Sequence, residues 1–125
     1  MSNVQEKPEG GRGHYKLEAW KRARELVLSV YKLTQTFPKE EMFGLAAQMR
    51  RAAVSIPSNI AEGAARAGER EFVQFLNISR GSLSELETQL LIATDLGYIK
   101  NNDSVFELVD LVSRLITGLR KSIQK

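Results

Sequence analysis

A run of heptad spacing between residues 76 and 97 is the feature that most constrains the fold of this chain. Small or apolar residues recur there in alternating steps of three and four, at Leu76, Ser79, Leu83, Leu86, Leu90, Ala93 and Gly97. Residues spaced in this way share one side of an α-helix, whereas the side chains of a β-strand alternate with a period of two. Gly68 supplies a break before this segment, and Glu69 and Glu71 suit a helix N-terminus. We therefore expect a long helix that follows Gly68 and stops at Gly97.

Two segments before it repeat the helical period. The first is expected over residues 16–36, and Phe37-Pro38 ends it, because a residue that precedes proline is pushed out of the α region. Its stripe consists of Trp20, Ala23, Val27, Val30, Thr34 and Phe37, and Leu26 and Leu33 widen it. The second is expected over residues 40–65, with an inner face of Leu45, Met49, Ala52, Ile56 and Ile60.

A fourth segment follows the heptad run. Ser104 and Glu107 have the spacing of a capping box, and the apolar pattern then continues to Ile123. Four helices with short connections predict an all-α fold, an antiparallel up-down-up-down four-helix bundle. Residues 1–13 are rich in Gly and poor in apolar side chains, so we expect a flexible N-terminal tail followed by one bundle domain over residues 14–125.

Pro57 lies inside the second predicted helix. An interior proline removes a backbone hydrogen bond and costs about 3 kcal/mol, so it could end the helix. The apolar spacing nevertheless continues in phase on both sides of Pro57. A kinked but continuous helix therefore fits the pattern better than a helix that ends there.

Small and apolar residues also occupy the outer side of this helix, where a monomeric bundle would normally carry Lys and Glu. We expect this surface to contact another copy of the chain, since small side chains let a second helix approach closely. The expected interface residues are Val54, Ser55, Pro57, Ser58, Ala61 and Glu62. The alternative is a helix sunk between two neighbours of its own bundle.

The composition excludes several kinds of chemistry. The chain has no Cys and a single His, His14, so Cys-His and Ser-His-Asp arrangements lack their parts, and we expect no enzyme, metal or cofactor. Without Cys, a reducing cytoplasm is the natural setting. No apolar run approaches the ~18 residues of a membrane span, and no signal-peptide pattern is present at the N-terminus.

The basic residues indicate a different kind of partner. A formal net charge of +3 permits nucleic-acid binding, and an oligomer would multiply this charge. We expect Arg50, Arg51, Arg66 and Arg70 to contact phosphates, with structured RNA favoured. The alternative is that these arginines pair with carboxylates such as Glu62, in which case the chain is a structural or adaptor module for a protein partner.

Residues 15–121 resemble a known family. The matching elements are the opening helix LEAWKRARELV, then Phe37-Pro38, Gly44-Leu45, Gln48, Arg50-Arg51-Ala52, Ser55-Ile56-Pro57, Asn59 to Gly63, Phe75-Leu76, Gly81-Ser82-Leu83, Glu85-Leu86-Glu87 and Gln89-Leu90. With SIPSNIAEG as its most specific part, this pattern resembles the four-helix-bundle proteins associated with intervening sequences of bacterial 23S ribosomal RNA genes.

The resemblance implies a bundle that assembles into a ring-like homopentamer. It also implies similarity to the accessory proteins of diversity-generating retroelements, which share the fold and bind nucleic acid and a reverse transcriptase. The biochemical role of the family is not established, and the resemblance implies no catalytic site.

Overall fold

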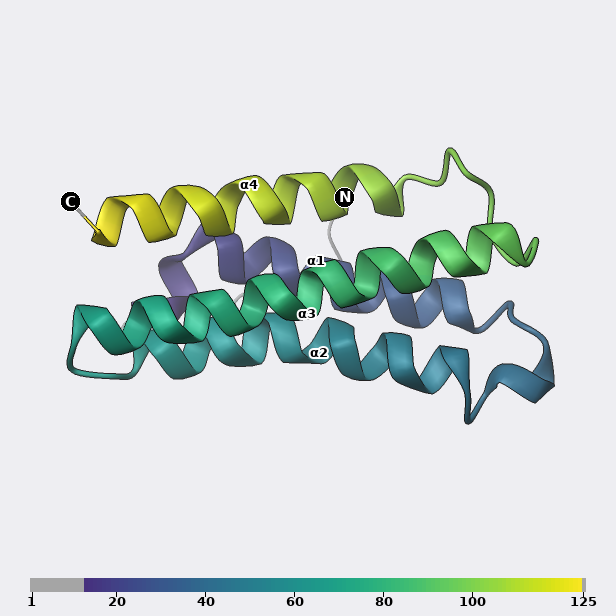
Figure 1. The fold of residues 1–125 in the computed structure, drawn as a ribbon, viewed down its shortest axis with the longest axis horizontal. Helices are drawn as coiled ribbons and strands as arrows, with labels where there is room; N and C mark the ends of the chain where they lie inside the picture. The colour runs from purple at the N-terminus through teal and green to yellow at the C-terminus, as the bar shows by residue number, and fades with distance from the viewer. Residues whose placement is uncertain (1–12, 125) are drawn as a thin grey trace.

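The computed structural model describes residues 13–124, and within them every element is helical (Figure 1). The elements are η1 (Gly13–Lys16), α1 (Glu18–Thr34), η2 (Lys39–Glu41), α2 (Leu45–Ala64), α3 (Glu69–Asp95) and α4 (Val105–Ile123). The expected N-terminal tail lies outside the described residues, except for Gly13 at its end. The prediction of four long helices and of no strand is confirmed for residues 13–124.

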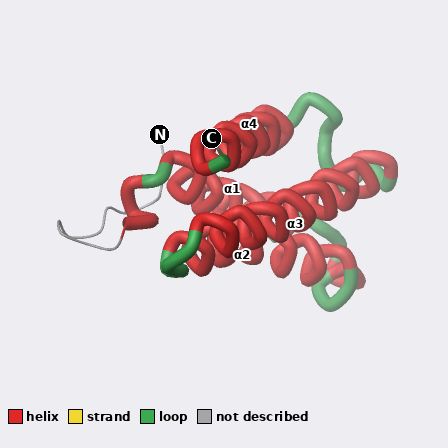
Figure 2. Tube along the Cα trace, turned by 60° about the vertical axis from the view of Figure 1, so that its left-hand side comes forward, coloured by secondary structure: helices red, strands yellow, loops and turns green. Residues whose placement is uncertain are grey.

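The four helices lie side by side, with α1 against α2, α2 against α3, α3 against α4, and α4 against α1. The α2–α3 contact is the most extensive. The α1–α2 and α3–α4 connections lie at one end of the molecule, and the α2–α3 connection lies at the other, beside the end of α4 (Figure 1). α4 packs over α1 and α3, away from α2 (Figure 2).

The core consists of the side chains that the periodicity indicates. In the heptad run, Leu76, Ser79, Leu83, Leu86, Leu90 and Ala93 are all buried. Met49, Ile56 and Ile60 of α2 are fully buried opposite them, with Leu26 and Val30 of α1 and Val112 and Ile116 of α4. The inward faces of the helices therefore follow directly from the spacing of apolar residues.

α2 begins at Leu45, five residues later than the expected start at Glu40. Glu41 lies in η2, and its carboxylate accepts a hydrogen bond from the backbone N–H of Leu45 (3.2 Å) and one from the Tyr98 hydroxyl (2.9 Å). The first N–H groups of a helix have no acceptor within the helix, so Glu41 satisfies one of them from outside α2. The hydrogen bond to Glu41 raises the pKa of the Tyr98 hydroxyl above its usual value, and loss of hydration adds a smaller effect in the same direction.

The stop at Gly97 is confirmed. Gly97 has a φ of +81°, its N–H bonds to the Thr94 carbonyl, and the Tyr98 N–H bonds to the Ala93 carbonyl (both 2.9 Å), as in a Schellman motif. The expected capping box at the start of α4 is wrong. Ser104 makes no side-chain cap bond, and the carboxylate of Asp103 accepts the Val105 N–H instead (2.9 Å).

α2 runs without a break through Pro57, as expected. Three successive carbonyls just before the proline, those of Val54, Ser55 and Ile56, each accept a side-chain hydrogen bond. The donors are Ser58 Oγ (2.8 Å), Asn59 Nδ2 (2.8 Å) and, from α3, Ser79 Oγ (2.9 Å). Polar side chains thus bond the backbone around a residue that cannot donate to the helix ladder.

Candidate assembly and nucleic-acid interface

The Arg50 side chain contacts residues of α1. Its Nε donates to Thr34 Oγ1 (2.9 Å), and its guanidinium lies 4.6 Å from the centroid of the Tyr31 ring. Thr34 is buried in the last turn of α1, so this contact ties the start of α2 to the end of α1. These contacts give Arg50 a role in the fold, and the expectation from the sequence that it binds phosphate stays a prediction.

Arg66 and Arg70 flank the α2–α3 turn and are both exposed. Arg66 Nη2 lies 3.4 Å from Glu62 Oε2, and its guanidinium lies over the Phe75 ring at 5.1 Å. The Arg66 and Glu62 side chains are 44% and 52% exposed, so their ion pair is weak and solvent-screened. Arg70 lines a shallow cleft of about 320 Å³ with Val73 and Ile123.

The four candidate arginines do not form one patch. Arg50 and Arg51 lie in the second turn of α2, whereas Arg66 and Arg70 follow its end. At 1.5 Å per residue, these pairs are separated by roughly 20 Å along the helix axis. Arg50 and Arg51, which belong to the family motif, therefore lie toward one end of the bundle, and Arg66 and Arg70, which lie outside the motif, are at the other.

Charge is distributed unevenly between these ends. One end is formed by the start of α1, the α2–α3 turn and the end of α4, and we call it the basic end. Its basic residues are Lys21, Arg22, Arg24, Arg66, Arg70, Arg120 and Lys121. The acidic residues there are Glu18, Glu25, Glu62, Glu69 and Glu71. At the opposite end, the five carboxylates Glu40, Glu41, Asp95, Asp103 and Glu107 are balanced by the five cations Lys32, Lys39, Arg50, Arg51 and Lys100, whereas the basic end has two more cations than carboxylates.

Some cations of the basic end already have partners. Arg22 pairs with Glu25 at 2.9 Å, and Lys21 lies 3.8 Å from Glu18. Arg120 donates to Asn77 Oδ1 at 3.3 Å. Arg70 and Lys121 are exposed, and Arg66 is exposed as well, although it pairs weakly with Glu62, so these three side chains can be reached by a ligand in solution.

The residues of the expected contact surface on α2 differ in their exposure. Val54 is 40% exposed, Ser58 and Glu62 are exposed, and Ala61 is half-buried. Ser55 Oγ lies 2.8 Å from Ser82 Oγ on α3, so it occupies the groove between the two helices. Pro57 departs from the expectation, since it is buried within the chain itself. Of the two interpretations of this stretch, packing inside the bundle applies to Pro57, and outward exposure applies to Val54 and Ser58.

α3 supplies a part of this face that we did not expect from the sequence. Ile78 and Ile92 are 50% and 43% exposed, and Glu85 lies midway between them at heptad spacing. Residues seven apart share a helix face, so these three form a second stripe beside the buried seam. Two apolar residues in that stripe, out of phase with the core, were a signal that could have been recognised in the sequence.

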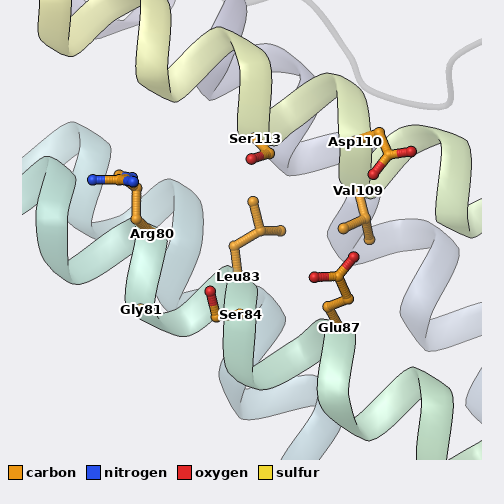
Figure 3. Close-up of a pocket in the computed structure, with 8 residues that line it drawn as sticks. All are labelled: Arg80, Gly81, Leu83, Ser84, Glu87, Val109, Asp110 and Ser113. Atoms are coloured by element: carbon orange, nitrogen blue, oxygen red, sulfur yellow. The ribbon is translucent and has the colours of Figure 1, made fainter.

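A cleft of about 430 Å³ lies between α3 and α4 (Figure 3). Leu83 and Val109 are buried beneath it, and the small residues Gly81, Ser84 and Ser113 also line it. Arg80 lies at one end of the cleft, and the carboxylates of Glu87 and Asp110, from the two helices, lie at the other (Figure 3).

Residues 13–124 lack the features of a membrane span and of a metal site. No described helix combines the length and hydropathy that crossing a bilayer requires. Within the same residues, no three His, Cys, Asp or Glu side chains come together as a possible metal site.

Comparisons with known proteins place these features in a family context. The sequence model described as "23S rRNA-intervening sequence protein" matches residues 15–118. A crystal structure of a protein of unknown function from the S23 ribosomal protein family of Bacteroides thetaiotaomicron has a TM-score of 0.60 and 21% identity, covering 84% of this chain and 94% of that one. At this identity the similarity establishes the fold. No curated protein matches the chain.

Proposed function

Because the chain belongs to the 23S rRNA-intervening sequence protein family, we propose that it is a non-enzymatic cytoplasmic protein that assembles with copies of itself and binds nucleic acid. The subunit is an up-down-up-down bundle with a kink at Pro57, and the assembly is a homopentameric ring. Structured RNA is the favoured ligand, held by contacts between Arg or Lys side chains and phosphates.

The uneven charge distribution is the observation that supports this proposal. Exposed Arg66 and Arg70 flank the α2–α3 turn, and Lys121 comes from the end of α4, which lies at the same end of the bundle. A ring of parallel copies would repeat this basic end around its rim. Phosphate contacts from several subunits then add up, although each subunit has few.

Fluorescence anisotropy of a labelled stem-containing RNA at several salt concentrations tests the ligand. Each phosphate contact contributes nearly one unit to the slope of log K against log[salt], so Arg66→Ala and Arg70→Ala should each reduce the slope by about one for every subunit that binds the RNA through that side chain. Lys39→Ala, an exposed cation at the other end, is the matched control and should leave the slope unchanged. Equal effects from all three variants would refute binding at the basic end.

Light scattering tests the assembly separately. A homopentamer has five times the 14.0 kDa mass of one chain. A mass that stays at one chain over the micromolar range would refute self-assembly, whatever the RNA titration shows.

A second candidate is an adaptor that docks a protein such as a reverse transcriptase, without a nucleic-acid role of its own. The exposed Phe43 and Met42 favour it, since 91% and 57% of their surfaces are accessible just before α2. Large apolar side chains exposed together are typical of protein contacts. Under this alternative, Phe43→Ser would abolish partner binding, and RNA binding would be weak and absent above low salt.

A further inference from the structure

Arg51 is a cation without a counterion in the described chain. It is exposed on α2, and among residues 13–124 no carboxylate lies within ion-pair distance of it. Its outward neighbours one and two turns later are Val54 and Ser58, a half-exposed apolar residue and a small hydroxyl. A partner helix could therefore approach this side of α2 closely while it supplied an acceptor for Arg51.

The α3–α4 cleft has the complementary features. Its base is apolar, from Leu83 and Val109, and an added Cβ at Gly81 would meet no atom within 4 Å, so there is room for a side chain to enter. Glu87 and Asp110 both extend into the cleft (Figure 3). No cation of residues 13–124 pairs with either carboxylate.

The register of α2 and α3 sets these groups at one height. Ser55 of α2 lies beside Ser82 of α3, and the Ile56 carbonyl accepts from Ser79. Because the two helices are antiparallel, one turn back along α2 corresponds to one turn forward along α3, which places Arg51 level with about residues 84–86. Glu87 is thus within roughly 5 Å of the height of Arg51, a distance that an arginine side chain can span.

In a closed ring, the similar height of Arg51 and Glu87 allows these residues of neighbouring copies to meet. Copies around a ring axis parallel to the helices are related by rotation without translation, so equivalent residues of all copies lie at one height. Arg51 of one copy therefore lies at the height of Glu87 in the next. The α2–α3 side and the α3–α4 side share α3 and are not opposite each other, so successive contacts turn toward closure instead of extending a filament.

We infer that α2 of one copy docks on the α3–α4 cleft of the next copy, where Arg51 pairs with Glu87 and Asp110. This contact rests on the proposed self-assembly and specifies its two surfaces. It is heterologous, as a ring of more than two subunits requires. The small side chains of α2 lie against the Gly81–Ser84 side of the cleft, and the ion pair fixes the register.

Charge reversal in the full chain tests the contact, with the mass measured by light scattering over a concentration series. Arg51→Glu and Glu87→Arg should each raise the dissociation constant at least about tenfold, because each places like charges together. The double variant Arg51→Glu/Glu87→Arg should restore assembly to within about threefold of the wild type. Far-UV circular dichroism verifies that each variant is folded.

The matched control is Arg51→Glu/Glu85→Arg. Glu85 lines the same α2–α3 groove as Arg51 in its own chain, so this swap places opposite charges within one subunit and leaves the proposed contact between subunits with like charges. It should remain as defective as Arg51→Glu. If the wild type assembles and the single variants assemble equally well, the proposed contact is overturned while self-assembly stands. The same conclusion follows if Glu85→Arg restores the assembly of Arg51→Glu and Glu87→Arg does not. A monomeric wild type would overturn the proposed assembly as well.

Discussion

Gly63 lies where α2 and α3 approach each other closely, and its substitution by alanine tests this packing. A Cβ at this position would lie 2.8 Å from Phe75 Cβ, 2.9 Å from Phe72 Cδ1 and 3.2 Å from the Phe72 carbonyl oxygen. Two of these three atoms are a backbone oxygen and a Cβ, which cannot move without shifting the first turns of α3. Gly63→Ala should therefore strain the junction of the two helices.

Two effects of opposite sign set the magnitude. Overpacking in a close-packed site costs about 1–3 kcal/mol, while replacing a helical glycine by alanine gains at most about 0.5–1 kcal/mol from helix propensity, and less in the last turn of α2, where Gly63 lies. Because the neighbours are rigid, the cost should exceed the gain, and we expect Gly63→Ala to lower the free energy of unfolding by about 1–2 kcal/mol.

Urea unfolding followed by far-UV circular dichroism measures this difference, at matched protein concentrations because the proposed assembly would stabilise the folded state. Gly118→Ala is the control, since Gly118 is exposed within α4 and an added Cβ there meets no atom within 4 Å. The control should be more stable than the wild type by about 0.5–1 kcal/mol. If Gly63→Ala gained stability as Gly118→Ala does, the close approach of α2 and α3 would be refuted.

Three other substitutions have defined outcomes. Arg50→Ala should lower the free energy of unfolding by about 1–2 kcal/mol in urea titrations, because it removes the bond to Thr34. Tyr98→Phe should lower the melting temperature at pH 7, since the phenol donates to Glu41. The raised pKa of Tyr98 means that its stabilising effect is complete below the unfolded value of 10.0 and is lost as pH rises through the folded pKa, so the two melting curves should converge at alkaline pH. Gly97→Ala should cost about 1–2 kcal/mol in the same urea assay, because its positive φ strains any residue with a Cβ.

Helix interiors were predictable from the sequence because their signal is redundant. The seam from Leu76 to Ala93 repeats the same spacing over several turns, and each turn confirms the next. Helix starts depend on single hydrogen bonds, and these were predicted less well. Ser104 has the right spacing for a capping box, but Asp103, one residue earlier, provides the acceptor.

The candidate site shows the same division. The exposure of Val54 and Ser58 was predictable, because it follows from their angular position on one helix. The different surroundings of the Arg50 and Arg51 side chains were not predictable, although the two residues are adjacent in sequence. One residue turns the side chain by about 100°, so Arg50 contacts α1 while Arg51 extends into solvent.

Four amphipathic helices, the end of the third at Gly97 and the family motif SIPSNIAEG all follow from the amino-acid sequence alone. They depend on local periodicity and on backbone preferences, which act over a few residues. The burial of Pro57 and the shared cleft of Glu87 and Asp110 became visible only in the folded chain. Those outcomes depend on how neighbouring helices are rotated and shifted against each other, and contacts such as Ser55 to Ser82 set that register across 27 residues of chain.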